Sequence, residues 1–127
     1  MLVTHFHFGG RCDEAIILYE NAFNTKVDFI DRTETGGVLH AEMHILGQRI
    51  MMNDYYGSKG INTVDFNIQM VPIFKSKDQL LECYEKLKDE AFYASAPQQV
   101  FYSPLVADVT DKFGIRWGLM VDENLDE

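Results

Sequence analysis

The histidines of this chain alternate with other residues in two short stretches. His5 and His7 do so near the start, and His40 and His44 flank Glu42 further along. Because successive side chains of a β-strand point to opposite faces of a sheet, this spacing puts all four histidines and Glu42 on one face. Imidazole and carboxylate groups bind divalent metals and carry protons, so the pattern indicates either a metal site or a polar binding surface.

The spacing limits how many of these groups one metal ion could bind. Same-face neighbours on a strand lie about 6.6 Å apart, which places His40 and His44 about 13 Å apart. One ion could bind His40 with Glu42, or Glu42 with His44, together with His5 or His7 from an adjacent strand. The alternative is a solvated polar face, which antiparallel sheets commonly have, and we favour that interpretation.

Two arginines add a second kind of candidate. Arg49 and Arg116 each follow a glycine by two positions, and a guanidinium can hold a carboxylate or phosphate group of a ligand. In a chain with 20 acidic residues, a surface ion pair is an equally good interpretation. These patterns identify no catalytic residue. The residues that we expect to line a polar pocket are His5, His7, His40, Glu42, His44, Arg49, Met51, Asn67, Gln69, Arg116 and Gly118.

The elements that must position these residues occur twice. Tyr-Glu-Asn-Ala at 19–22 matches Tyr-Glu-Lys-Leu at 84–87, and Gly-Gln-Arg at 47–49 matches Gly-Ile-Arg at 114–116, at a nearly constant offset. Each Tyr-Glu lies in a stretch with helical periodicity, and each glycine opens a strand-like stretch. A duplicated unit of strand, helix and three strands predicts two similar halves with a cleft where they meet.

The expected elements follow from periodicity and turn residues. In the first half we expect strands at 2–8, 27–30, 38–46 and 49–53 and a helix at 12–23. In the second half we expect strands at 63–71, between Pro97 and Pro104, at 105–109 and at 115–121, with a helix from the capping box of Ser76 and Gln79 to about 91. The side chains expected to face the helices are Leu2, Phe6, Phe8, Leu39, Ala41, Met43, Ile45, Phe66, Ile68, Met70, Trp117, Leu119 and Val121.

The composition is that of an ordinary globular protein, with 46% hydrophobic and 24% charged residues. The net charge of -9 argues against binding nucleic acid or a membrane surface, because both need a basic surface. No apolar run approaches the roughly 20 residues that cross a bilayer, and the first residues lack the basic segment of a secretion signal. Cys12 and Cys83 fall in predicted helices and are expected to be reduced, half-buried thiols. We therefore expect a cytoplasmic protein.

Five segments resemble a known family. They cover 6–15, 18–23, 40–42, 47–54 and 110–117, and they are similar to the vicinal oxygen chelate superfamily of glyoxalase I, bleomycin-resistance proteins and extradiol dioxygenases. Within it the chain resembles the PhnB-like branch, whose members often carry a label borrowed from 3-demethylubiquinone methyltransferase. The resemblance implies an α+β fold, in which two βαβββ modules form curled mixed sheets around a cleft.

The resemblance also implies a domain layout. It predicts one PhnB-like domain over 1–127, with a first module at about 1–55, a linker at about 55–62 and a second module at about 63–121. PhnB-like proteins as a group are small dimers, so a homodimer is expected. The methyltransferase label has no support, because the chain lacks a glycine-rich turn between a strand and a helix for a nucleotide-like cofactor.

The family's metal ligands do not carry over to this chain. The position in the first strand falls near Val3, or at His5 if the alignment shifts by one pair of residues. The remaining positions fall at Met51, near Asp65 and at Gly118, where the family has glutamate, histidine and glutamate. We therefore expect no glyoxalase-type metal set and no cofactor.

Three hypotheses for function remain. The first is a protein that binds an unknown small molecule in a polar pocket between the two halves. The second is a metal-dependent enzyme, either lyase-like or dioxygenase-like, in which His5, His40 and Glu42 hold a divalent ion that polarises a small oxygenated substrate. The third is a protein whose groove serves only for dimerisation. Convergence of His5, His40 and Glu42 on one point would favour the second.

Overall fold

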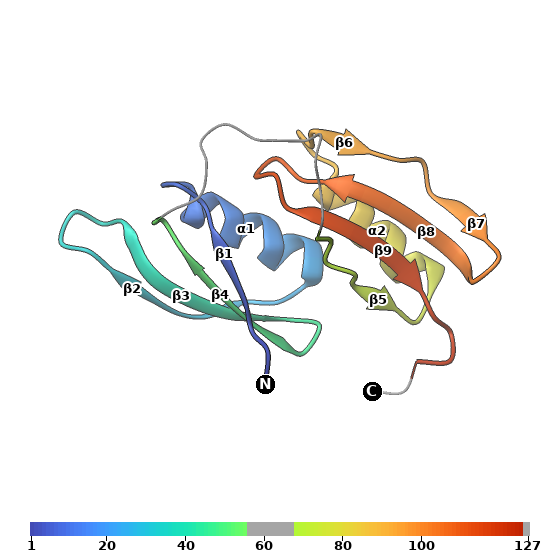
Figure 1. Ribbon diagram of the computed structural model, residues 1–127, viewed down its shortest axis with the longest axis horizontal. Helices are drawn as coiled ribbons and strands as arrows, with labels where there is room; N and C mark the ends of the chain where they lie inside the picture. Colours follow the sequence, from blue (N-terminus) through green and yellow to red (C-terminus); the bar gives the residue numbers. More distant parts are fainter. Residues whose placement is uncertain (56–67, 126–127) are drawn as a thin grey trace. The chain divides into compact units, whose positions relative to one another are not determined.

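The computed structural model describes residues 1–55 and 68–125, shown as coloured ribbon in Figure 1. The chain divides into two compact units, Met1–Ile61 and Asn62–Glu127. Each unit packs one helix on one face of a mixed sheet, as expected of an α+β fold. The linker expected at about 55–62 lies outside the described residues from 56 onward, and so does the first part of the strand expected at 63–71.

The first unit has four strands and one helix. Its sheet has the order β1-β4-β3-β2, in which β1 runs parallel to β4 and the other neighbours are antiparallel. The elements are β1 (Thr4–His7), α1 (Cys12–Phe23), β2 (Val27–Arg32), β3 (Val38–Ile45) and β4 (Gln48–Asn53).

The second unit repeats this plan. Its sheet has the order β5-β9-β8-β6, with β7 also paired to β8, and β5 again runs parallel to the last strand. The elements are β5 (Ile73–Phe74), α2 (Lys77–Leu87), β6 (Tyr93–Ala94), β7 (Gln98–Val100), β8 (Ser103–Thr110) and β9 (Arg116–Val121). The strands of two residues, β5 and β6, were not predicted, because two residues are too few to produce an alternating pattern.

The structure confirms that the repeated sequences occupy matching places. Gly47 and Gly114 both take a positive φ, of 80° and 86°, in the turn before the last strand of each unit. Glycine adopts this left-handed conformation without steric cost. Ile50 and Trp117, three residues further along, are both buried beneath the helix of their unit.

The helix boundaries follow from local chemistry. Asp13 and Glu14 stand in the first turn of α1, where the helix dipole favours acidic groups. Asn24 ends α1 with a left-handed φ of 52°. The Ser76 side chain accepts a hydrogen bond from the Gln79 backbone N–H at 3.2 Å, so the predicted cap of α2 is confirmed. That helix ends at Leu87 instead of about 91, because Glu90 has a φ of 54° and cannot continue a right-handed helix.

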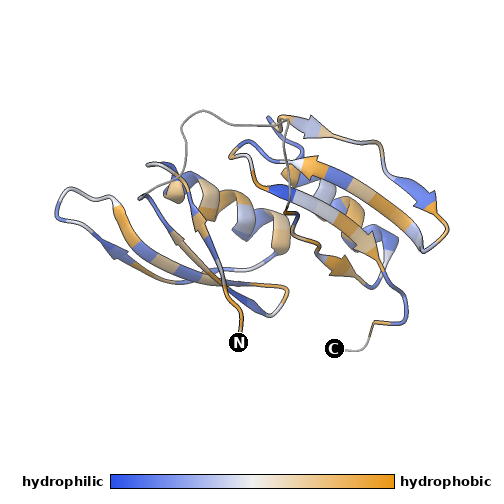
Figure 2. Cartoon of the chain, in the orientation of Figure 1, coloured by the Kyte–Doolittle hydropathy of each residue, from blue (hydrophilic) through white to orange (hydrophobic). Residues whose placement is uncertain are grey.

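A hydrophobic core lies between the helix and the sheet of each unit. Hydrophobic and hydrophilic residues alternate along the longer strands (Figure 2), which places one set beneath the helix. In the first core Tyr19 of α1 contacts Phe6 and Phe8 of the first strand region, with ring centroids 6.2 and 6.1 Å apart. In the second, Trp117, Leu119 and Val121 are buried, as predicted.

Three side chains predicted to be buried are exposed instead. Leu2 is 98% exposed because it precedes β1, which begins at Thr4. Leu39 is 47% exposed because it is the extra residue of a bulge: Asp31 pairs with His40 and Arg32 with Val38, so Val38 takes the buried place. Ile68 is 77% exposed because it belongs to no strand, and the chain meets the second sheet only at Met70, which forms a bridge with Trp117.

The two cysteines lie deeper than expected. Cys12 and Cys83 are free thiols with 0% and 1% of their surface exposed, although half-buried side chains were predicted. Burial raises the pKa of each to about 12, so both remain protonated and unreactive near neutral pH. Neither α1 nor α2 in the described chain is long and apolar enough to cross a membrane.

Candidate functional site

Polar side chains gather on the face of the first sheet opposite α1. Along β3 and β4 the buried residues face the helix, and the residues between them point to the other side. We call this second side the polar face. Its residues are His5, His7, Phe29, Asp31, His40, Glu42, His44, Arg49, Met51 and Asn53.

Strand pairing brings these residues together from different parts of the chain. Met51 of β4 pairs with His5 of β1 on one side and with Glu42 of β3 on the other. Asn53, at the end of β4, pairs with His7. The polar face therefore combines residues from the start, the middle and the end of the first unit, as the alternation in the sequence predicted.

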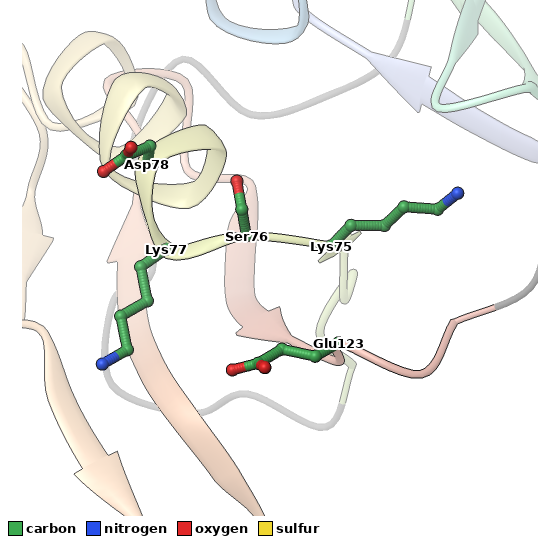
Figure 3. Close-up of a pocket in the computed structure, with 5 residues that line it drawn as sticks. All are labelled: Lys75, Ser76, Lys77, Asp78 and Glu123. Carbon is green, nitrogen blue, oxygen red and sulfur yellow. The ribbon is translucent and has the colours of Figure 1, made fainter.

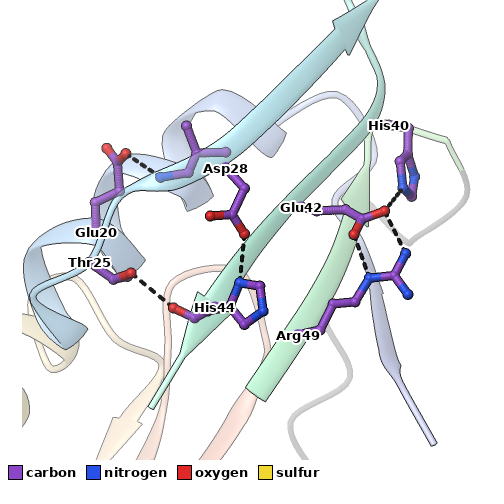
Figure 4. A network of polar contacts seen from close by, with 8 residues as sticks. Glu20, Thr25, Asp28, His40, Glu42, His44 and Arg49 are labelled. Atoms are coloured by element: carbon purple, nitrogen blue, oxygen red, sulfur yellow. Dashed lines mark hydrogen bonds and ion pairs between the residues drawn. The ribbon is translucent and has the colours of Figure 1, made fainter. Parts of the chain in front are cut away.

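Glu42 is held by two neighbours (Figure 4). Its carboxylate accepts from Arg49 Nε at 2.5 Å and Nη2 at 2.9 Å, and from His40 Nε2 at 2.7 Å. These hydrogen bonds, that of Arg49 first, lower the pKa of Glu42 to about 2. Glu42 is therefore an ionised carboxylate at physiological pH, and its charge offsets that of Arg49.

Asn53 connects two histidines on the same face. The side chain of His7 donates from Nδ1 to Asn53 Oδ1 at 2.9 Å, and Asn53 Nδ2 donates to His5 Nε2 at 3.3 Å. The rings of His5 and His7 have centroids 4.5 Å apart, and His40 lies 5.9 Å from His5. Burial, and then the neighbouring charges that His7 and His40 can carry, lower the pKa of His5.

His44 has a separate partner. Its Nδ1 lies 2.7 Å from a carboxylate oxygen of Asp28, and both side chains are exposed. Figure 4 shows this pair apart from the Arg49, Glu42 and His40 group, further along β3. His44 is therefore a natural control for experiments on the other histidines.

The hydrogen bonds leave little room for a metal ion. Among residues 1–55 and 68–125, no three His, Cys, Asp or Glu side chains are arranged to hold one. His5, His40 and Glu42 are neighbours, but both oxygens of Glu42 accept from Arg49 and one also accepts from His40. A metal ion could bind there only after displacing these donors.

The remaining predicted pocket residues lie in the second unit or outside the described residues. Gln69 Nε2 donates to Asp108 Oδ1 at 2.8 Å, and its side chain lies across Gly118, where an added Cβ would come within 2.6 Å of it. Arg116 begins β9 and is half-buried. Asn67 is not among the described residues. Whether these residues and the polar face line one pocket stays a prediction.

Two aspartates have structural roles. Asp54 accepts from the backbone N–H groups of Cys12 at 2.8 Å and Val38 at 2.7 Å, so it ties α1 to β3. Asp111 is fully buried and accepts from the Trp117 indole at 2.9 Å and from two backbone N–H groups of the turn before β9.

A shallow depression of about 470 Å³ lies at the start of α2. It is lined by Lys75, Ser76, Lys77, Asp78 and Glu123, and Figure 3 shows the two lysine side chains pointing in different directions. The Ser76 hydroxyl already caps the helix. These side chains do not converge on a point, so the depression is a weaker candidate than the polar face.

Two residues that form side-chain hydrogen bonds with the predicted pocket residues, Asn53 and Asp108, were not singled out from the sequence. Asn53 continues the alternation of Arg49 and Met51 along β4, and that period-2 signal was enough to place it on the polar face. Asp108 had no such signal, because its partner Gln69 is brought to it only by the packing of the second sheet.

No family model matches this sequence, and no curated protein does. Solved structures do match. A Bacillus cereus protein described as a 3-demethylubiquinone-9 3-methyltransferase, PhnB protein, superposes with a TM-score of 0.80 at 21% identity, covering 95% of this chain and 98% of that one. A glyoxylase/bleomycin resistance protein/dioxygenase domain from Frankia gives 0.70 at 15% identity, covering 95% of both chains.

The Listeria monocytogenes fosfomycin resistance protein FosX, crystallised with Mn(II) and sulfate, gives a TM-score of 0.67 at 10% identity, covering 95% of this chain and 89% of that one. Similarities at these identities establish the fold and leave the activity open. They agree with the connectivity of both units, in which a parallel first strand and a helix precede the antiparallel strands. The chain therefore has the glyoxalase/bleomycin-resistance fold.

Proposed function

We propose that this chain binds a small molecule on the polar face of its first sheet and does so without a metal ion. The observation that carries the proposal is the connection of polar side chains from β1, β3 and β4 into hydrogen-bonded groups. His5, Asn53 and His7 form one, and His40, Glu42 and Arg49 form the other, with the two groups meeting at the His5 and His40 rings. Preorganised polar groups of this kind fix the orientation of a ligand.

Two further properties of the site support binding over a purely structural role. The side chains of His40 and Glu42 are 27% and 12% exposed, so they are shielded but still reachable. Phe29 packs beside His40 with ring centroids 5.9 Å apart and is itself 48% exposed. An apolar ring beside converging polar groups is typical of small-molecule sites.

The proposal omits a metal because of the state of Glu42. Its carboxylate would be the anionic ligand of a divalent ion, yet the Arg49 guanidinium holds it in a two-pronged contact. Such a charge-assisted pair is among the strongest hydrogen-bonded arrangements in proteins. The metal-dependent enzyme is therefore the less favoured alternative, and homodimerisation stays a prediction of the family resemblance.

The test is ligand binding to the full chain, monitored by NMR with 15N-labelled protein and a library of small metabolites. We expect at least one compound to shift residues of β1, β3 and β4 in a saturable way. The His40→Gln variant should bind it more weakly, and the matched variant His44→Gln, on the same strand, should bind it normally. Compounds that shift only residues near Ser76 would contradict the proposal.

A second measurement addresses the metal alternative. The protein is purified without a metal-binding tag, and its thermal unfolding is followed with added Ni(II), Zn(II), Mn(II) and Fe(II). Stoichiometric metal that is lost in His5→Gln and Glu42→Gln would overturn the metal-free site. Size-exclusion chromatography with light scattering, run on the same sample, tests the expected homodimer.

A further inference from the structure

We propose that the polar face recognises an uncharged molecule bearing hydroxyl groups, such as a polyol or a monosaccharide, through a donor on His5 and an acceptor on His40. This inference rests on the proposed function, because it specifies the class of ligand at that same site. It follows from the hydrogen bonds that fix which nitrogen of each ring carries a proton, and from the charges around the two rings.

The acceptor follows from the contact between His40 and Glu42. A carboxylate accepts hydrogen bonds and cannot donate them, so His40 must carry a proton on Nε2, which lies 2.7 Å from Glu42. In the neutral imidazole the other nitrogen, Nδ1, then has a lone pair. His40 therefore offers an acceptor to a ligand.

The donor follows from the side-chain amide of Asn53. In the structure the amide oxygen faces His7 Nδ1 at 2.9 Å, and because this oxygen can only accept, His7 Nδ1 is the donor. The NH₂ group consequently points to His5 Nε2, at 3.3 Å, and this nitrogen must accept. A neutral His5 then carries its proton on Nδ1 and offers a donor, so neighbouring rings 5.9 Å apart present opposite hydrogen-bonding groups.

A hydroxyl group matches this pair, because one oxygen both accepts and donates. A carboxylate or a fully ionised phosphate can only accept, and it would face the lone pair of His40. Its charge would also meet Asp31 on β2, which pairs with His40, while the charges of Glu42 and Arg49 offset each other. In a chain with a net charge of -9, the surrounding field adds to this repulsion of anions.

Apolar surface next to the two rings fits the same class of ligand. Phe29 lies beside His40, and Met51 lies between Glu42 and His5 in the sheet. The C–H faces of a sugar ring can pack on an aromatic or thioether side chain while its hydroxyls reach the imidazoles. His44 lies on the same face of the sheet but is paired with Asp28 further along β3, outside the two hydrogen-bonded groups that form the proposed binding site.

The first experiment reads the proton positions directly. The full chain is labelled with 15N-histidine and kept at about pH 8, where ordinary imidazoles are neutral, and side-chain 15N spectra report which nitrogen of each ring is protonated. We expect Nδ1–H on His5 and Nε2–H on His40. The opposite assignment on either ring would overturn the proposal, because the donor and acceptor would then be absent.

The second experiment compares probes that differ only in charge. Glucose is titrated against glucuronate, and glycerol against glycerate, while the same imidazole signals are followed. We expect the neutral member of each pair to shift His5 and His40 saturably and to bind about tenfold more tightly than its acid, with His44 unchanged. Equal or tighter binding of the acids, or no shift from any of the four probes, would overturn the proposal.

An Asn53→Asp variant tests the mechanism, since it keeps the size of the side chain but removes the NH₂ donor. His5 must then place a proton on Nε2, and binding of the neutral probe should weaken about tenfold, whereas His44→Gln should leave it unchanged. Unchanged binding in folded Asn53→Asp would count against the proposal.

The library screen distinguishes this inference from the proposed function. If another compound of the library shifts residues of the polar face, the proposed function survives the failure of this inference. If no compound does, both fail.

Discussion

The two units share one connectivity but use the outer faces of their sheets differently. In the first unit that face carries three neighbouring imidazoles, a carboxylate and a guanidinium. At the matching place in the second unit, Gly118 stands where the first has Met51, and the Gln69 side chain covers it and binds Asp108. Beneath the helices the equivalent residues stay apolar and buried, as Met52 and Leu119 are. The two units therefore share the apolar packing between helix and sheet. They differ in the polar side chains on the opposite face of the sheet, which the packing does not constrain.

The largest expected difference between the units concerns the carboxylates that bind backbone N–H groups, Asp111 in the second unit and Asp54 in the first. Replacing Asp111 by Ala leaves the Trp117 indole N–H and two backbone N–H groups without their acceptor inside the protein. Each such group costs about 1–3 kcal/mol, so we expect a loss of about 3 kcal/mol or more in the free energy of unfolding. Urea denaturation, monitored by the fluorescence of Trp117, measures this loss.

Asp54→Ala is the matched variant in the first unit. Asp54 is only half-buried and accepts from two backbone N–H groups, so its removal should cost about 1–2 kcal/mol. If Asp54→Ala destabilised the protein as much as Asp111→Ala, then burial would not be what separates the two carboxylates.

Gly118→Ala probes the covered face of the second sheet. The added Cβ would come within 2.6 Å of the Gln69 side chain, which must move and give up its hydrogen bond to Asp108. Because Gln69 is a flexible side chain, we expect a modest cost of about 1 kcal/mol. Chemical denaturation of Gly118→Ala, Gln69→Ala and the double variant checks this, since a steric origin requires the two effects to be less than additive.

The sequence predicted the elements of the first unit closely because its strands are long and alternate. Residues 38–46 and 49–53 were expected as strands, and β3 and β4 differ from these bounds by one residue each. The exposed Leu39 could not be foreseen, because a bulge shifts the alternation and depends on how β2 pairs. The second unit was harder, since β5 and β6 have two residues each and are defined only by their partners β9 and β8.

The candidate site was predictable in its residue types and not in its connections. Alternation alone placed His5, His40 and Glu42 on one face. It could not show that Arg49 would pair with Glu42, because that contact depends on the register of β3 and β4, in which Arg49 stands opposite His44. A metal site and a metal-free site therefore share the same sequence pattern, and only the partner of Glu42 separates them.

The pH dependence of the unfolding free energy should distinguish the polar face of the first sheet from the corresponding face of the second. The pKa of Glu42 is lowered to about 2, so its contribution is fully present above the unfolded pKa, near the ordinary value for glutamate, and is lost as the pH falls through about 2. Unfolding free energies measured between about pH 5 and pH 2 should therefore fall more steeply in the wild type than in Glu42→Gln. Parallel curves would show that the Arg49 contact does not favour the ionised form.

The smallest expected effect belongs to His5, whose pKa is lowered by burial and by its histidine neighbours. Protonation is then harder in the folded than in the unfolded chain, so the unfolded chain binds more protons as the pH falls through the ordinary imidazole range, and stability declines there. His5→Gln should flatten this decline slightly, and the matched variant His44→Gln, at an exposed histidine outside the cluster, serves as the control. Thermal unfolding from about pH 8 to about pH 5 resolves the three curves. If His44→Gln flattened the decline and His5→Gln did not, the imidazole cluster would not be the group that distinguishes the polar face from its counterpart in the second unit.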